Sequence, residues 1–175
     1  MATGSLIKID EEIVTSAVAS VTLTGIDSTY DVYMVKFENV KPSADNVNLE
    51  MRFTVSGTPD SSANYDLAWK KLDATTTFAN QSATNLTASY VNIQVGGDTN
   101  EQNNGIMYIF NANNSSEYTF CTIETVFSNP FSGGLNGSQG GNVLTVAQAV
   151  DGVQFFFSTS VNHSSGTYTL YGLKK

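Results

Sequence analysis

Hydrophobic and polar residues alternate along much of this chain with the two-residue period of a β-strand. In the clearest run, Val47–Val55, every odd position is apolar and every even position is polar. Residues 16–24 repeat the pattern more weakly, and residues 65–70 and 91–95 repeat it over shorter lengths. These runs predict strands with one buried and one solvated face. Residues 31–39 are apolar on both faces in their middle, which predicts a strand at the centre of a sheet.

Turn residues join several of these runs into predicted hairpins. Residues 105–112 and 117–127 are separated by an Asn-Asn-Ser-Ser segment, and these residue types favour tight turns. Residues 152–158 and 166–174 predict a second hairpin with a loop between them. About ten short strands with turns between them are typical of an all-β fold. We therefore predict a single antiparallel β-sandwich of the jelly-roll-like kind.

The segments between these strands lack a clear period. Three long stretches are predicted as loops, namely residues 57–64, 96–104 and 128–142. Within the last of them, the glycine-rich residues 132–141 predict a flexible surface loop that could contact a partner. Residues 143–152 fit either one helical turn or a strand. Residues 10–20 could begin as a helix, but their alternation favours a strand.

The composition narrows the class of protein. The 175 residues carry a formal net charge of −8, and an acidic surface repels phosphate backbones, so nucleic-acid binding is disfavoured. A single cysteine excludes an intrachain disulfide. The start has no signal-peptide pattern and no apolar run is long enough to cross a bilayer, so we expect production in a reducing cytoplasm and no membrane insertion. We expect one domain, residues 16–175, preceded by an N-terminal arm, residues 1–15.

Residues with catalytic potential are few. His163, the single histidine, lies in a polar turn and is expected to be an exposed loop residue rather than a base. Cys121 lies in the middle of a strand and is expected to be a small buried hydrophobe. Glu50, Glu117 and Glu124 could supply a glycosidase carboxylate pair, but their spacing singles out no pair, and solvated strand positions are the favoured interpretation. The sequence therefore predicts no catalytic residue and no enzyme.

No cofactor or metal site is predicted either. Residues 96–105 are rich in oxygen ligands, but they lack the glycine and the final glutamate of an EF-hand loop. We expect a turn there, and a weak calcium site completed by residues from elsewhere is left open. The glycine-rich residues 132–141 lack the Lys-Ser/Thr pair of a phosphate-binding loop.

Aromatic residues are frequent and mostly occupy alternating strand positions, which predicts that they form the core. Tyr30, Tyr65, Trp69 and Tyr90 lie near strand ends and are the best candidates for exposed rings, although cross-strand packing explains them equally. The residues predicted to contact a ligand or partner are Tyr65, Trp69, Tyr90, Phe131 and Leu135.

Motifs near both ends of the chain carry a resemblance. Residues 150–158, VDGVQFFFS, and 165–174, SGTYTLYGLK, follow a pattern of Val-Asp-x-Ile/Val, a Phe-rich strand, a turn, and Ser-Gly-Thr-Phe/Tyr-x-Leu-Tyr-Gly-Ile/Leu-Lys. Residues 20–42 add a Thr-rich strand, Tyr-Asp-x-Tyr and an Asn-Val-x-Pro end. In these motifs the chain resembles a jelly-roll-like β-sandwich domain of tailed-bacteriophage virion proteins. It departs from the pattern at Gln154, where a basic residue is usual, and in a longer last turn.

This resemblance implies a non-enzymatic structural protein on the virion surface, made in the host cytoplasm. A capsid decoration protein is favoured over a tail-fibre module, because we expect a free-standing domain without a fibre shaft or stalk. The implied partners are further copies of the chain, for example in a trimer, and the major capsid protein or tail proteins. The predicted contact elements are residues 2–12 and 128–142. The alternatives are a tail-fibre or receptor-binding module that binds host glycans, and a glycan-degrading sandwich enzyme.

Overall fold

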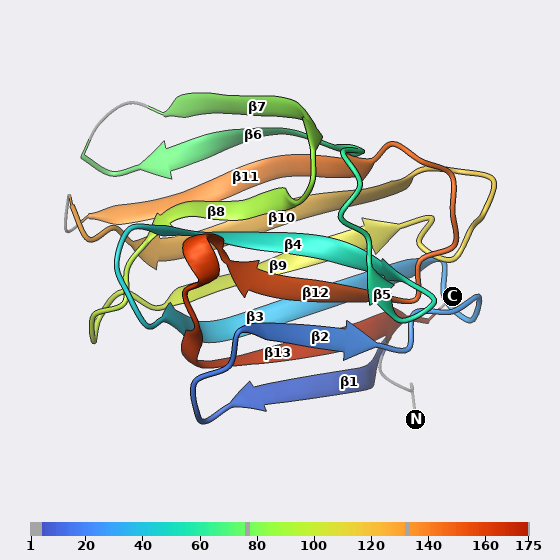
Figure 1. Ribbon diagram of the computed structural model, residues 1–175, viewed down its shortest axis with the longest axis horizontal. Coiled ribbons are helices and arrows are strands. Elements are labelled where there is room, and N and C mark those ends of the chain that lie inside the picture. Colours follow the sequence, from blue (N-terminus) through green and yellow to red (C-terminus); the bar gives the residue numbers. More distant parts are fainter. Residues whose placement is uncertain (1–4, 76–77, 132–133, 175) are drawn as a thin grey trace.

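The chain folds into two antiparallel β-sheets packed face to face (Figure 1). The computed structural model describes residues 5–75, 78–131 and 134–174, and this part of the chain contains thirteen strands, more than the ten or so expected. The elements are β1 Leu6–Val14, β2 Ser20–Thr24, β3 Val32–Pro42, β4 Val47–Val55, β5 Thr58–Pro59, β6 Tyr65–Asp73, β7 Ala79–Leu86, β8 Ser89–Val95, β9 Asn103–Phe110, β10 Thr119–Ser128, β11 Leu135–Leu144, β12 Gly152–Phe157, the 3-10 turn η1 Ser158–Ser160, and β13 His163–Leu173. The predicted all-β sandwich is confirmed. Within the described residues, no helix is long and apolar enough to span a membrane.

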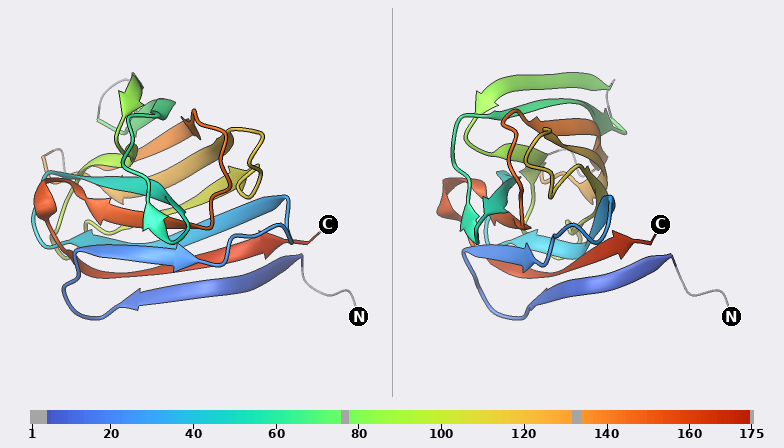
Figure 2. Two further views of the ribbon diagram at one scale, coloured as in Figure 1. Left: turned by 45° about the vertical axis from the view of Figure 1, so that its right-hand side comes forward. Right: turned by 90° about the vertical axis from the view of Figure 1, so that its right-hand side faces the viewer.

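The two sheets differ in size and form the two layers seen in Figure 2. The larger sheet has eight strands in the order β1-β13-β3-β9-β10-β11-β6-β7. The smaller sheet has five strands, in which β4 pairs with β12 on one side and with both β5 and β8 on the other, and β2 lies beyond β12. Strands β1 and β7 therefore form the two edges of the larger sheet.

Several sequence predictions are confirmed in detail. The strand expected at Val47–Val55 is β4, with the same bounds. The strand expected at the centre of a sheet is β3, which lies between β13 and β9. The first predicted hairpin is the antiparallel pair β9 and β10. The alternation of β4, the two apolar faces of β3 and the turn residues between β9 and β10 were sufficient to place these segments.

The second predicted hairpin is wrong. Strand β12 pairs with β2 and β4 in the smaller sheet, whereas β13 pairs with β1 and β3 in the larger sheet. The segment between them, including η1, crosses from one layer to the other. Phe155 of β12 and Tyr168 of β13 face each other across this interface, with ring centroids 5.0 Å apart. Phe37 of β3 packs against both rings, with a centroid distance of 6.3 Å to each. The Phe-rich motif thus builds the core between the sheets.

Strand β11 also differs from the prediction. Its residues 135–141 were expected to belong to a flexible loop, but β11 pairs with β10 along its whole length and with β6 on its other side. Residues 132 and 133 of the predicted loop lie outside the described residues. Gly140 faces Trp69 of β6 directly in the register, and the two strands approach so closely there that a β-carbon would have no space. Gly137 and Gly140 thus serve close packing rather than flexibility.

Buried polar side chains explain the rest of the β11 sequence. Ser138 of β11 and Thr125 of β10 both donate to the Asn92 side-chain oxygen, each at 2.6 Å. Asn92, on β8 in the opposite sheet, donates in turn to Asn103 at 2.9 Å. All four side chains are almost fully buried. The two sheets are therefore joined here by hydrogen bonds between polar side chains, which an apolar-in, polar-out pattern does not reveal.

The segment predicted as an N-terminal arm contains β1. This strand pairs with β13 from Leu6 to Val14, with a bulge between Lys8 and Asp10. Residues 1–4, which include the start of the predicted contact element, lie outside the described residues. The strand expected at residues 16–24 begins only at Ser20. Residues 145–151, where a helical turn was an open alternative, run from β11 to β12 without forming a helix.

Candidate interaction surface

His163 is a buried structural residue, so the prediction of an exposed loop histidine is wrong. It begins β13 and its side chain has no exposed area. Its Nε2 lies 3.3 Å from the Phe155 carbonyl oxygen, to which it can only donate, and its Nδ1 lies 3.2 Å from the Tyr168 hydroxyl. Burial lowers the pKa of the imidazole from 6.5 to about 4, against a smaller opposing effect of the Phe155 hydrogen bond. The ring is neutral at pH 7 and positions strands rather than a substrate.

The other candidate catalytic groups do not form a site. Cys121 is 2% exposed, as predicted, and burial raises the pKa of its thiol to about 12. Glu50 is half-buried on the outer face of the smaller sheet, and burial raises the pKa of its carboxyl, with Arg52 opposing the shift. Glu124 is exposed on the outer face of the larger sheet. Glu50 and Glu124 thus lie on opposite sides of the sandwich, too far apart for the carboxylate pair of a glycosidase, which needs a separation of roughly 5–10 Å.

The expected exposed rings are mostly buried. Tyr65 has no exposed area, and its hydroxyl accepts from the Phe53 N–H and donates to the Asp60 carbonyl, both at 3.0 Å. Trp69 is 5% exposed and lies on the inner face of β6. Tyr30 and Tyr90 are half-buried. The prediction of Tyr65 and Trp69 as surface contacts is therefore wrong, since neither ring can stack on a sugar at the surface.

Large exposed apolar side chains gather instead at the end of the larger sheet where β10 joins β11 and β6 joins β7. Phe131 is 68% exposed and Leu135 is 58% exposed, and both were predicted contact residues. Phe78, immediately before β7, is 64% exposed and was missed. The Ala74 N–H donates to the Leu135 carbonyl at 2.9 Å, so the two connections lie side by side. We call Phe78, Phe131 and Leu135 the apolar tip.

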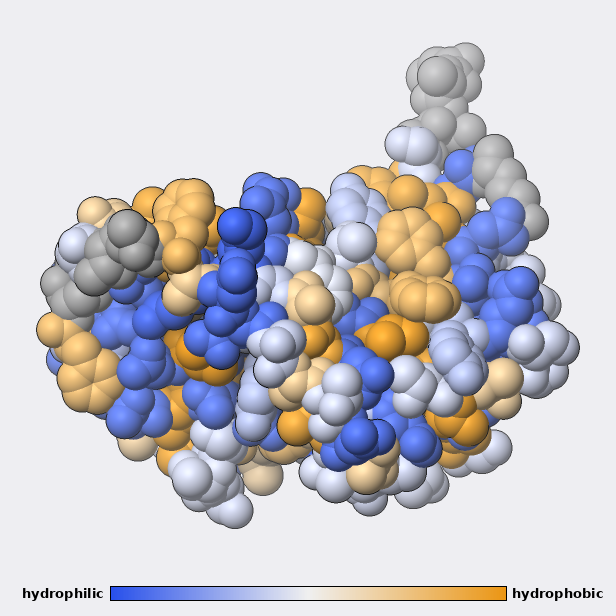
Figure 3. Space-filling view, turned by 90° about the horizontal axis from the view of Figure 1, so that it is seen from above, coloured by the Kyte–Doolittle hydropathy of each residue, from blue (hydrophilic) through white to orange (hydrophobic). Residues whose placement is uncertain are grey.

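Hydrogen bonds hold the backbone of the apolar tip at Phe131. The side-chain oxygen of Asn129, which is 3% exposed, accepts from the Phe131 N–H at 2.8 Å. The Asn129 N–H donates to the Gly134 carbonyl at 3.1 Å, which closes the connection between β10 and β11. In Figure 3, which looks onto the β7 side of the molecule, apolar residues form separate groups among polar ones. An exposed apolar side chain whose backbone is hydrogen-bonded, as at Phe131, can contact a partner at a reduced cost in conformational entropy.

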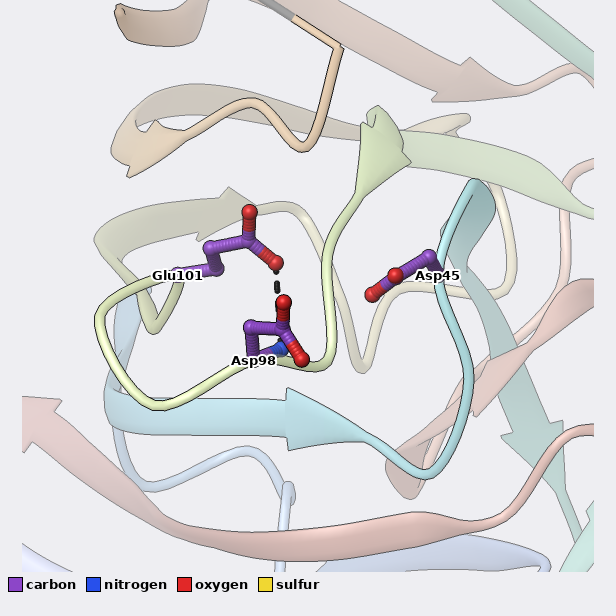
Figure 4. A group of neighbouring side chains, drawn as sticks. All are labelled: Asp45, Asp98 and Glu101. Carbon is purple, nitrogen blue, oxygen red and sulfur yellow. Dashed lines mark hydrogen bonds between the residues drawn. The ribbon is translucent and has the colours of Figure 1, made fainter. Parts of the chain in front are cut away.

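Three carboxylates meet near the same end of the molecule (Figure 4). Asp98 and Glu101 follow β8, whereas Asp45 comes from the connection between β3 and β4, and their ligand oxygens lie within 4.8 Å of one another. The Gly97 N–H donates to Asp45 at 2.6 Å, and the Asp98 N–H donates to Glu101 at 3.0 Å. Sequence reasoning considered residues 96–105 but had no signal for the distant Asp45.

This acidic group could hold a hard cation through its oxygens. Calcium takes about 6–8 oxygen ligands, so three carboxylates supply only part of a coordination shell. Two of the three carboxylates also accept backbone N–H bonds, which accounts for their positions without an ion. The arrangement is therefore compatible with a cation but does not require one.

Comparison with known proteins gives no relative for this chain. No protein-family model, curated protein or solved structure matches it.

Proposed function

We propose that the protein is a non-enzymatic structural component of a bacteriophage particle, a capsid surface protein that decorates the head. The motifs that resemble phage virion domains support this proposal, because their residues have structural roles in the fold. Phe155 and Tyr168 form the contact between the sheets. Asp151 accepts from the Thr54 hydroxyl at 2.5 Å and from the Gly57 N–H at 2.8 Å, and so holds the turn between β4 and β5.

The single observation that carries the proposal is the apolar tip. Phe78, Phe131 and Leu135 are each more than half exposed, although the core of the sandwich is well filled elsewhere. A stable protein interface buries roughly 800 Å² on each partner and has an apolar centre with a polar rim. The tip supplies such a centre, and the charged residues Lys71 and Asp73 lie on the strand pairs beside it. Docking by burial of this surface requires no catalytic group.

A receptor-binding module that recognises host glycans is the alternative from another functional class. It would need exposed rings as a stacking platform, and Tyr65 and Trp69 are buried. Phe78 and Phe131 are exposed, but phenylalanine rings lack the hydrogen-bonding groups that usually accompany sugar recognition. The apolar tip therefore favours a protein partner over a glycan.

Sedimentation with phage heads tests the proposal. Purified protein is mixed with heads from the source phage from which the endogenous copies have been stripped, and the bound fraction is measured after pelleting. We expect the wild type to bind and the double variant Phe131→Ser, Leu135→Ser to bind roughly tenfold more weakly or worse, since two buried apolar side chains are lost. The matched control is Ile13→Ser, which removes an equally exposed side chain from β1. Equal binding of both variants would refute docking through the tip, and no binding by the wild type would refute the capsid assignment.

A further inference from the structure

The two edges of the larger sheet differ in a way that bears on self-association. An edge strand presents unpaired backbone N–H and C=O groups to any other strand, and proteins commonly block such edges with charges or bulges. Strand β1 has both devices, because it carries Lys8, Asp10, Glu11 and Glu12 and has a bulge between Lys8 and Asp10. This edge is protected against pairing.

Strand β7 has neither device over most of its length. Its sequence, ANQSATNL, contains no charged residue and no proline. It pairs with β6 without a break from Ala79 to Ala83, and the register shifts only beyond that point, where Asn85 has a positive φ of 56°. In the described part of the chain, β6 is the one strand that pairs with it. About five consecutive residues are thus available for a new ladder.

The charge distribution also favours approach through this edge. The β6–β7 hairpin, residues 65–86, contains Asp66, Asp73, Lys70 and Lys71 and is neutral overall, whereas the whole chain has a net charge of −8. Two copies that meet through β7 therefore bring their neutral ends together and keep their acidic parts apart. Repulsion between like-charged copies is weakest in this orientation.

We propose that β7 pairs antiparallel with β7 of a second copy, around a two-fold axis at Ser82. This register places Asn80 opposite Thr84 and Gln81 opposite Ala83 of the other copy. The members of each pair lie on the same face of the strand, since Asn80 and Thr84 are both exposed whereas Gln81 and Ala83 are both half-buried. The edge is therefore self-complementary, as a two-fold interface requires.

The contact extends the larger sheet continuously across two copies. It goes beyond the proposed function, specifies the self-association that the resemblance implies, and does not depend on where the protein resides. Because the axis is two-fold, it predicts a dimer or an assembly of dimers rather than the trimer considered from the resemblance.

A cysteine at the axis tests this geometry. Residues directly opposite in an antiparallel pair have Cα atoms about 4.5–5.5 Å apart, within the range that a disulfide bridges. Ser82→Cys should therefore cross-link under mild oxidation, as a band of twice the chain mass on a non-reducing gel. The matched control is Asn80→Cys on the same exposed face, because two copies of residue 80 would be four positions out of register, roughly 13 Å apart. Cys121 does not interfere, since it is buried.

Light scattering on the unoxidised protein gives an independent measurement. The wild type should be a dimer at micromolar concentration, and Ser82→Lys should shift it to monomer by placing two like charges opposite each other. Ile13→Lys adds the same charge to the other edge and should leave the dimer intact. A monomeric wild type, a dimer unaffected by Ser82→Lys, or equal cross-linking at positions 80 and 82 would each overturn the proposal. Because these measurements use purified protein, they do not depend on the capsid assignment.

Discussion

The substitution Gly140→Ala should disrupt the junction between β11 and β6. A β-carbon at Gly140 would lie 2.3 Å from the Trp69 Cβ, 2.4 Å from its Cα and 2.5 Å from the Ala68 carbonyl oxygen. Non-bonded carbon atoms normally approach no closer than about 3.5 Å, so the strands must separate by about 1 Å. Two of the three clashing atoms belong to the backbone, which cannot rotate away. Overpacking of this kind costs roughly 1–3 kcal/mol, and we expect at least about 3 kcal/mol here because the contact is with backbone.

The neighbouring Gly141 provides a matched control. A β-carbon there would meet only the Cys121 carbonyl oxygen, at 3.1 Å, which a small adjustment relieves. Gly141→Ala should therefore change the free energy of unfolding by less than about 1 kcal/mol, since alanine also reduces the entropy of the unfolded chain. Trp69 is the single tryptophan and is buried, so its fluorescence during urea denaturation reports on this junction directly. If both variants unfolded at the same urea concentration, close approach of β11 and β6 would not be what excludes a side chain at Gly140.

Three further predictions concern buried groups. The pKa of His163 is about 4 in the folded state and 6.5 in the unfolded state, so the unfolded state binds the proton more readily between these values. The free energy of unfolding should therefore fall by about 3 kcal/mol as the pH drops from 6.5 to 4. Urea titrations of His163→Gln over this pH range should lack most of the decrease. Cys121 should not react with a thiol reagent in the native protein and should react fully in urea, and rapid native labelling would contradict its burial. Asp151→Ala should cost about 1–3 kcal/mol, because it leaves the buried Thr54 hydroxyl and the Gly57 N–H without their acceptor; a melting temperature unchanged from wild type would contradict this role.

Much of the fold was predictable because most strands have one apolar face. Strand β4 alternates without exception, and β3 is apolar on both faces because it lies between two other strands and under the opposite sheet. The pattern of apolar residues along a strand shows which of its faces are buried. Which faces are buried depends on whether the strand lies at the edge or in the middle of its sheet. The pattern carries no information about which strands pair, so the assignment of β12 and β13 to one hairpin failed although both strands were correctly located.

Two strands were missed in the sequence. One of them, β11, buries polar side chains, and the other, β7, buries few side chains of any kind. Strand β11 turns Asn136, Ser138 and Asn142 toward the interior, where Ser138 bonds to Asn92 of the opposite sheet. Strand β7 is an exposed edge strand with small and polar side chains. Neither has a hydrophobic period to detect. His163 was misjudged for a related reason, because its partners Phe155 and Tyr168 come from different sheets and its neighbours in the sequence are polar.

The candidate surface was partly predictable. Phe131 and Leu135 were named because large apolar residues stood out in a polar, glycine-rich stretch, and both are exposed. Phe78 could not be assigned to the apolar tip from the sequence, nor Asp45 to the acidic group. Each lies far in the sequence from the residues it accompanies, and only the folded arrangement of the strands brings them together. Trp69 and Tyr65 were misplaced because position near a strand end does not determine which face a ring occupies.

Immunogold labelling of intact phage particles tests the central claim most directly. Antibody raised against the purified chain is applied to particles from the source lysate, and its binding to free protein is checked in parallel. The capsid assignment predicts label distributed evenly over the heads. Label confined to the tail, or no label on particles although the antibody binds the free protein, would contradict it.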